Sequence, residues 1–246
     1  MELRDTYALL EFQAASTKKK SLSGEPAANI LALPKGDQVY HRIRNLIMHY
    51  ELKPGQKVFE DEMASLFSIS RTPVREALRR LSNEGLITLY PKRYAEVTFF
   101  TPEMTKQLGT MRLAQDILAG RLAIYYGSDA EFTQLTALSD ICEAAAKAGD
   151  LYGRITADRH FHLKITEIAK NEILMKYQRE VYLRVHLIQL QNSMHSPAQE
   201  RISSHTKLIQ ALMERNEQLF IDEVCQRMAR MYQLDEKLVD MYRSRQ

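Results

Sequence analysis

The sequence has few cysteines to cross-link a secreted domain and no long apolar segment to anchor a chain in a membrane. Only 2 of its 246 residues are cysteine, too few for a disulfide framework or a cysteine-rich metal site. No apolar run approaches the length of a membrane-spanning helix. Acidic residues stand near the N-terminus, where a secretion signal would be basic. We therefore expect a cytoplasmic protein with no membrane partner.

Glycine and proline are also scarce, at 9 and 7 residues, which argues against a loop-dominated chain. The prolines are unevenly placed, because after Pro102 only Pro197 remains. A long stretch with one internal proline is typical of successive helices. The formal net charge of +3 is too small to indicate nucleic-acid binding by itself. These features predict a mainly α-helical protein with a boundary near Phe100–Pro102.

The chain divides into three expected segments. Residues 1–36 form an N-terminal extension that we expect to be partly flexible. Residues 37–100 hold three of the seven prolines and form one small domain. Residues 101–246 form a helical domain.

The pattern of residues 37–100 predicts a winged helix-turn-helix. Apolar spacing indicates helices over 37–50 and 60–67. A third helix is expected to start with Thr72 as N-cap and Pro73 at the first helical position, and to stop at Gly85. Strands over 86–90 and 96–100 then flank a turn and form the wing.

Basic residues gather on the predicted third helix and on the turn between the strands. Arg75 and Arg79 lie one turn apart, Arg71 lies just before them, and Lys92 and Arg93 occupy the turn. Phosphates need cations, and base edges in the major groove need donors on a helix that fits there. The alternative is a solvated helix face, which would not explain why the turn, cap, arginine row and basic hairpin agree.

Residues 38–99 resemble the DNA-binding domain of the GntR family of bacterial transcription regulators. The stretch SRTPVREAL, followed by L-x-x-E-G-L-I, carries the resemblance, and LYPKRYAEV extends it. The resemblance implies contacts to DNA from the third helix and the wing tip. With the arginine row, the expected DNA-binding residues are Ser70, Arg71, Thr72, Pro73, Arg75, Arg79, Lys92 and Arg93.

Two positions depart from the pattern of that family. Asp61 stands where the second helix usually opens with a basic residue, so an acid would face the DNA or point away from it. Tyr94 stands where the wing usually carries a glycine. The first departure concerns a phosphate contact, and the second concerns the conformation of the wing.

The second half predicts an antiparallel bundle of about six helices with short links. Its polar residues are unusual for a plain bundle. Asp158 and His162 lie one turn apart on an apolar face, and His205 and Arg227 share stripes with apolar residues. Buried charge needs a partner. Each histidine alone could be a satisfied core residue, but the set indicates a site. The expected helices span 102–126, 130–148, 151–169, 173–191, 197–214 and 217–242.

Residues 102–240 resemble the FCD ligand-binding domain of FadR-like regulators. The matching pieces are MRLAQDILAGRLA, DRHFHLKITEIAKNEIL and HTKLIQALMERNEQLFIDEV. The resemblance implies that Asp158, His162 and His205 fall on three of four metal-ligand positions and that Arg112 faces an anionic effector. The fourth ligand position falls on Arg227.

Arg227 leaves two alternatives, because a guanidinium has no lone pair for a metal. In one, the metal is absent, Arg227 pairs with Asp158 or receives the carboxylate of an effector, and the histidines serve as hydrogen-bonding walls. In the other, the aspartate and both histidines hold zinc or a similar ion and Arg227 swings aside. The expected effector-binding residues are Arg112, Asp158, His162, His205 and Arg227.

The sequence predicts a ligand-responsive transcription regulator and not an enzyme. We expect a homodimer that represses by binding an inverted-repeat DNA operator and is released by a small organic acid. One alternative is a DNA-binding regulator whose sensor pocket is vestigial. Another is a metal-dependent hydrolase, but no general base or nucleophile motif accompanies the predicted metal ligands.

Overall fold

The computed structural model describes residues 33–193 and 204–243. Most of the predicted N-terminal extension lies outside these residues, as does the start of the helix predicted over 197–214. The described part is mainly α-helical with one small sheet, as the sequence predicts. We call residues 35–97 the head and residues 102–243 the bundle.

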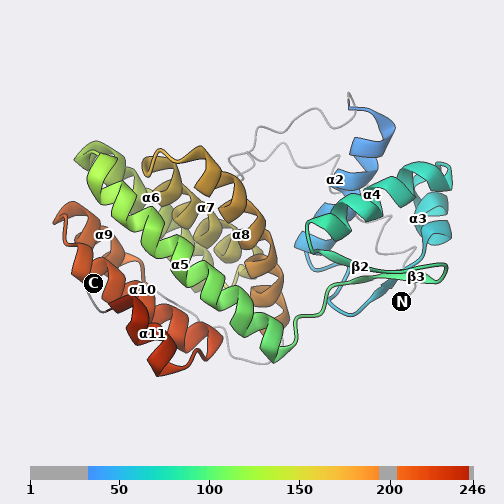
Figure 1. The fold of residues 1–246 in the computed structure, drawn as a ribbon. Coiled ribbons are helices and arrows are strands. Elements are labelled where there is room, and N and C mark those ends of the chain that lie inside the picture. Colours follow the sequence, from blue (N-terminus) through green and yellow to red (C-terminus); the bar gives the residue numbers. More distant parts are fainter. Residues whose placement is uncertain (1–32, 194–203, 244–246) are drawn as a thin grey trace. The chain divides into compact units, whose positions relative to one another are not determined.

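Three helices form the core of the head (Figure 1). Helix α2 spans Lys35–Met48, α3 spans Glu60–Phe67 and α4 spans Arg71–Asn83. Helix α4 packs against both α2 and α3. Its buried residues are Val74, Ala77, Leu78 and Leu81, which follow the spacing of one helical face.

Helix α4 begins two residues earlier than its sequence signals indicate. Ser70, and not Thr72, is the N-cap residue, so Arg71 is the first helical residue and Pro73 the third. Pro73 remains tolerated because the first four N–H groups of a helix have no intrahelical partner. The predicted stop at Gly85 is confirmed, since Gly85 has a φ of 75° directly after the last turn. The basic row therefore starts within the helix itself.

A three-stranded antiparallel sheet completes the head, in the order β1-β3-β2. The strands are β1, Lys57–Val58; β2, Ile87–Tyr90; and β3, Tyr94–Val97. Tyr90 pairs with Tyr94, so residues 91–93 form the tip of the wing. The residue with a left-handed backbone there is Lys92, with a φ of 61°. The wing thus turns at Lys92, and Tyr94 needs no glycine-like conformation.

The bundle contains seven helices in its described residues (Figure 1). The long helix α5 contacts α7 and α8 as well as α10, while α6 packs on α7 and α9 on α10. The bounds of the helices are α5, Pro102–Tyr126; α6, Asp129–Lys147; α7, Leu151–Ile168; α8, Glu172–Ser193; α9, Thr206–Met213; α10, Glu217–Tyr232; and α11, Glu236–Arg243.

Two glycines let α10 approach α5 closely. A Cβ atom at Gly109 would lie 2.4 Å from the Tyr232 ring, and one at Gly120 would lie 1.9 Å from the Phe220 ring. These separations are far below van der Waals contact, so only glycine admits the aromatic rings. The two glycines therefore set the spacing of the α5–α10 pair.

Two predictions for the C-terminal helices are wrong in detail. The single helix predicted over 217–242 is broken at Gln233, whose φ of 51° ends α10. His205 was expected inside a helix, but it is the N-cap residue of α9. Both corrections matter for the site described below, because they fix where Tyr232 and His205 present their side chains.

Candidate functional site

The basic residues of α4 and the wing line one groove on the head. Its wall from α4 contains Arg71, Arg75 and Arg79, and its wall from the wing contains Lys92 and Arg93. All five side chains are exposed. The structure thus brings together five of the eight residues that the sequence predicts for DNA binding. Ser70 and Pro73 line an adjoining hollow with Arg71, and Thr72 is exposed beside them.

Acidic residues of α3 pair with two of these arginines. Arg75 bonds Glu60 through two nitrogens, with Nη2 at 2.8 Å from Oε2. Arg71 places Nε 2.6 Å from Oδ1 of Asp61, and Asp61 lines the same groove. The acid that departs from the family pattern therefore faces the basic groove. The hydrogen bond from Arg75 is the main reason that the pKa of Glu60 is lowered.

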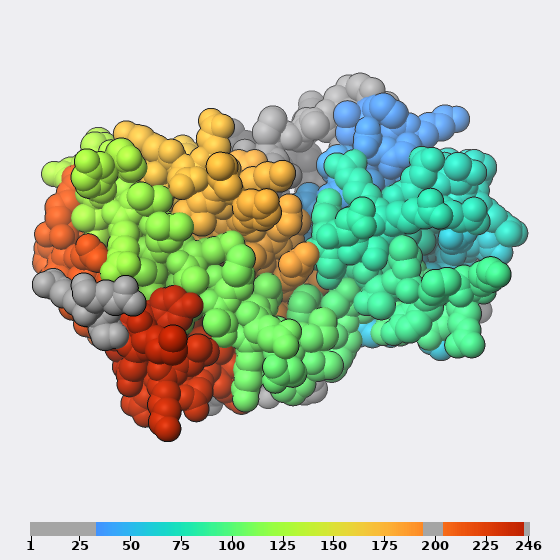
Figure 2. Space-filling model, in the orientation of Figure 1, coloured from blue at the N-terminus to red at the C-terminus, as the bar shows by residue number. Residues whose placement is uncertain are grey.

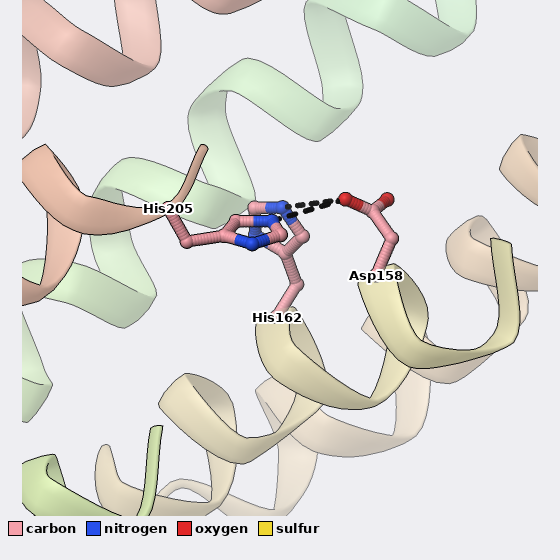
Figure 3. A group of neighbouring side chains, drawn as sticks. All are labelled: Asp158, His162 and His205. Atoms are coloured by element: carbon pink, nitrogen blue, oxygen red, sulfur yellow. Dashed lines mark hydrogen bonds and ion pairs between the residues drawn. The ribbon is translucent and has the colours of Figure 1, made fainter. Parts of the chain in front are cut away.

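The bundle buries a cluster of one carboxylate and two imidazoles. Figure 3 shows Asp158 and His162 on one helix, α7, with His205 reaching them from the start of α9. The Nε2 atoms of both histidines face one oxygen of Asp158, at 3.1 Å from His205 and 3.8 Å from His162. One candidate ligand atom from each residue lies within 4.8 Å of the others. The sequence therefore predicts this grouping correctly.

The charges in this cluster suit a metal ligand set. Burial raises the pKa of Asp158, but the hydrogen bond with His205 and nearby positive charge outweigh it and hold the pKa well below its usual value. Burial and the charge of Arg112 hold the pKa of His162 well below its usual value. An ionised carboxylate and a neutral imidazole are the forms that bind metals. The three residues could hold a metal ion.

Arg112 is fully buried and belongs to an internal network. Its Nε donates to Asp116 at 3.2 Å and to the Tyr182 hydroxyl, and its Nη1 donates to the Tyr232 hydroxyl at 3.1 Å. Asp116 also accepts from Gln178 at 2.6 Å. Burial raises the pKa of Asp116, and the hydrogen bonds from Arg112, Tyr182 and Gln178 oppose that rise. Arg112 therefore has a carboxylate partner within its own helix.

The network touches the cluster through His162. The His162 ring stacks on Tyr182, and its Nδ1 lies 3.9 Å from Asp116. His162 thus has Asp158 on one side and Asp116 on the other. Asp116 was not predicted from the sequence, although its i,i+4 spacing from Arg112 was a usable signal. Tyr182, Gln178 and Tyr232 had no signal in the sequence, because they come from other helices.

Arg227 is held by the Glu223 carboxylate and by the backbone just before His205. Its Nε donates to Glu223, one turn earlier on α10, at 2.9 Å, and its Nη2 donates to the Ser204 carbonyl. Its charge is near enough to contribute to the lowered pKa of His162. Glu223 was not predicted from the sequence either, and it supplies the negative charge that balances Arg227.

Comparisons with known proteins agree with both halves of this description. Residues 35–97 match the model of "Bacterial regulatory proteins, gntR family", and residues 107–230 match that of the "FCD domain". The chain belongs to the GntR family and carries an FCD domain. It is a DNA-binding transcription regulator of that family. No helix in the described residues is long and apolar enough to cross a membrane.

Relatives of this GntR-family chain are named transcription regulators. It is 26% identical to the HTH-type transcriptional repressor RspR of Escherichia coli over 74% of this chain and 81% of the relative. It is 26% identical to the HTH-type transcriptional regulator McbR of Escherichia coli over 60% of this chain and 67% of the relative.

Solved structures share the fold of this GntR-family chain. The E. coli McbR/YncC structure superimposes with a TM-score of 0.68 at 22% identity, covering 82% of this chain and 98% of that one. A GntR regulator from Rhodococcus sp. RHA1 gives a TM-score of 0.67 at 20% identity, covering 82% and 99%.

Proposed function

We propose that the protein is a homodimeric repressor that leaves an inverted-repeat operator when a small organic acid binds its FCD domain. Residues 37–100 would supply the DNA-binding domain and residues 101–246 the sensor. The groove between α4 and the wing carries the DNA-binding half of this proposal, because its cations come from a helix and a hairpin at once. RspR, a relative, is named a repressor.

Within that groove we assign different roles to α4 and the wing. Helix α4 enters the major groove, where Arg75 reads a base and Arg71 and Arg79 flank it. Ser70, Thr72 and Pro73 form the N-terminal end of α4, which would lie next to the sugar-phosphate backbone of the DNA. Lys92 and Arg93 hold phosphates, which position the head without reading sequence.

Replacing Arg75 by alanine tests the assignment. Arg75→Ala is expected to abolish specific operator binding, since a good base contact contributes about 1–3 kcal/mol of discrimination. The side chain is exposed on α4, so the fold should be retained. A gel-shift titration with the operator measures the loss, and circular dichroism checks the helix content. An operator affinity equal to that of wild type would refute the role of Arg75.

The buried cluster supports a metal site in the sensor. Asp158, His162 and His205 would supply an open N2O set, which suits zinc or a similar ion. Asp116 and Asp158 carry two negative charges against the single charge of Arg112, which favours a cation beside Asp158. Glu223 balances Arg227, so the arginine opposes a dication less than its charge alone suggests.

The effector would bind on the open side of this metal. A metal ion held by Asp158, His162 and His205 would attract an oxyanion. An effector with a carboxylate, such as a small organic acid, fits that requirement. Both guanidiniums are already paired, Arg112 with Asp116 and Arg227 with Glu223, so the carboxylate of an effector would compete with an acid one turn away on the same helix. The effector regulates only if it binds the DNA-competent and DNA-incompetent forms unequally. No residue here is assigned a catalytic role.

An exposed apolar stripe supports a homodimer formed through the bundle. Met104, Met111, Leu118 and Tyr125 repeat every seven residues along one face of α5, and each is at least 40% exposed. Helix α5 forms part of the surface in Figure 2. Large apolar residues aligned on one exposed face mark an interaction site. A second copy fits it, because an inverted repeat requires two heads related by a two-fold axis.

A further inference from the structure

We infer that Glu60 is a positioning residue for operator recognition: it grips one edge of the Arg75 guanidinium and so presents the other edge to a guanine. The inference deepens the proposed base contact of Arg75 and rests on it. Glu60 is the first residue of α3, and Arg75 lies in the second turn of α4. Neither residue needs to move for the pair to form.

The geometry of the pair decides which edge remains available. The Nε atom of Arg75 lies 3.0 Å from Oε1 and 3.1 Å from Oε2 of Glu60, and Nη2 lies 2.8 Å from Oε2. This side-on pairing uses the Nε edge of the guanidinium. The end of the group, formed by Nη1 and Nη2, is the part that matches the O6 and N7 acceptors of guanine. Glu60 takes the Nε–H and one N–H of Nη2, which leaves the second N–H of Nη2 and those of Nη1 free for an end-on contact with a base.

The pair also limits the freedom of Arg75 before DNA arrives. The Arg75 side chain is 53% exposed and would otherwise sample many rotamers. A side chain that is already ordered loses less entropy when it binds. The hydrogen bond from Arg75 lowers the pKa of Glu60, so the carboxylate is charged at neutral pH. Preorganisation by Glu60 should therefore favour a correct base over a wrong one.

A carboxylate in a basic groove has a second, opposite effect. Its charge repels phosphates, and phosphate attraction supplies most non-specific affinity. Removing Glu60 should therefore weaken operator binding and strengthen binding to unrelated DNA at the same time. A carboxylate that acts only by repulsion would change both affinities in the same direction. This difference in sign separates positioning from bulk electrostatics.

Glu62 provides the matched control for this test. It lies in the same first turn of α3 and is exposed, and it carries the same charge as Glu60. Each substitution to glutamine removes one negative charge near one helix N-terminus, so both should have a similar effect on helix stability. Only Glu60→Gln removes the side-on ion pair with Arg75.

The experiment uses the full-length chain and two DNA duplexes of equal length. One is selected by the wild type from a randomised library, and the other has mixed sequence. Glu60→Gln should bind the selected duplex about tenfold more weakly and the mixed duplex more tightly. Glu62→Gln should keep the ratio of the two affinities near the wild-type value. Equal ratios for the two variants would overturn the inference.

Arg75→Lys removes the side-on pair from the other partner, so it tests the inference even if Glu60→Gln does not fold. Arg75→Lys keeps the charge but cannot form a side-on pair, so it should lose selectivity while the salt dependence stays unchanged. In the double variant, Glu60→Gln should cost no further selectivity. Additive losses would count against positioning. If Arg75→Ala binds the selected duplex like wild type, the base contact itself fails. If Arg75→Ala loses binding but Glu60→Gln behaves like Glu62→Gln, only the positioning role fails.

Discussion

At the scale of single residues, charge balance governs the interior of the bundle. Asp116 and Asp158 are both buried, and each has a different set of partners. Asp116 faces Arg112, a permanent cation, whereas Asp158 faces His205 and His162. A buried charge without a partner lowers the free energy of unfolding, so each carboxylate requires a positive or hydrogen-bonding neighbour. Two substitutions test these constraints separately.

The first substitution is Arg227→His, which places an imidazole next to the three candidate ligands. It removes a cation and adds an imidazole as a fourth ligand position, so zinc affinity should rise about tenfold or more. Elemental analysis of the purified protein and zinc competition titrations measure the effect. Arg230→His, at an exposed position in the last turn of α10, is the control. Unchanged zinc binding in Arg227→His would contradict the placement of Arg227 beside the cluster.

The second substitution is Asp116→Asn, which keeps the shape of the side chain but removes the partner of a buried guanidinium. Breaking a buried ion pair from one side should lower the free energy of unfolding by about 3–5 kcal/mol. Glu217→Gln, which breaks the exposed Arg121–Glu217 pair, should cost at most about 1 kcal/mol. Thermal and urea unfolding compare the two. Equal stability losses would mean that Arg112 does not depend on Asp116.

At the scale of elements, the wing should contribute affinity without sequence preference. Lys92→Ala and Arg93→Ala should each weaken binding to every duplex and reduce the slope of log affinity against log salt by about 1. Affinities measured across a salt range give the slope. Lys237→Ala, on α11, removes a charge outside the groove and should leave the slope unchanged. A changed base preference with an unchanged slope would show that the wing reads bases.

The bounds of helices were predictable from the sequence where a proline or a glycine marks the end. Pro102 and Gly127 bound α5, and Gly85 follows α4, so the bounds of α5 and the end of α4 were predicted closely. The break after α10 has no glycine or proline. Gln233 adopts a left-handed conformation there, and the N–H of Leu234 bonds back to the carbonyl of Ala229. A polar residue in that conformation leaves no signal, so periodicity alone predicted one long helix.

The candidate site shows the same division between local and long-range information. The i,i+4 spacing of Asp158 and His162 was readable, because both lie on one helix. Joining them to His205 needed the family resemblance, since no local pattern tells which helix start faces α7. The partners of Arg112 from α8 and α10 depend on packing between helices. The side-on pair of Glu60 with Arg75 joins two helices of the head, and it too was missed.

At the scale of the whole molecule, the stripe on α5 predicts self-association. Leu118→Glu should shift the protein from dimer to monomer at micromolar concentration, because a charge would be buried at the centre of an apolar interface. Ala137→Glu, at an exposed position of α6, adds the same charge away from the stripe. Light scattering gives the mass, and a gel shift on the inverted repeat should show weaker binding by the monomer. A dimeric Leu118→Glu would place the interface elsewhere.

Helix α5 joins these scales through its two glycines. Gly109 and Gly120 admit the rings of Tyr232 and Phe220, Arg112 and Asp116 face the polar interior, and the opposite face carries the apolar stripe. Ten of its 25 residues are buried and the stripe takes four more, so over half of the helix is committed to packing or to the proposed interface. Few substitutions in this helix should be selectively neutral. Among relatives, residues should therefore be replaced more slowly along α5 than on the outer face of α6. Gly109 and Gly120 should vary least, because even the methyl group of alanine would displace the ring of Tyr232 or Phe220.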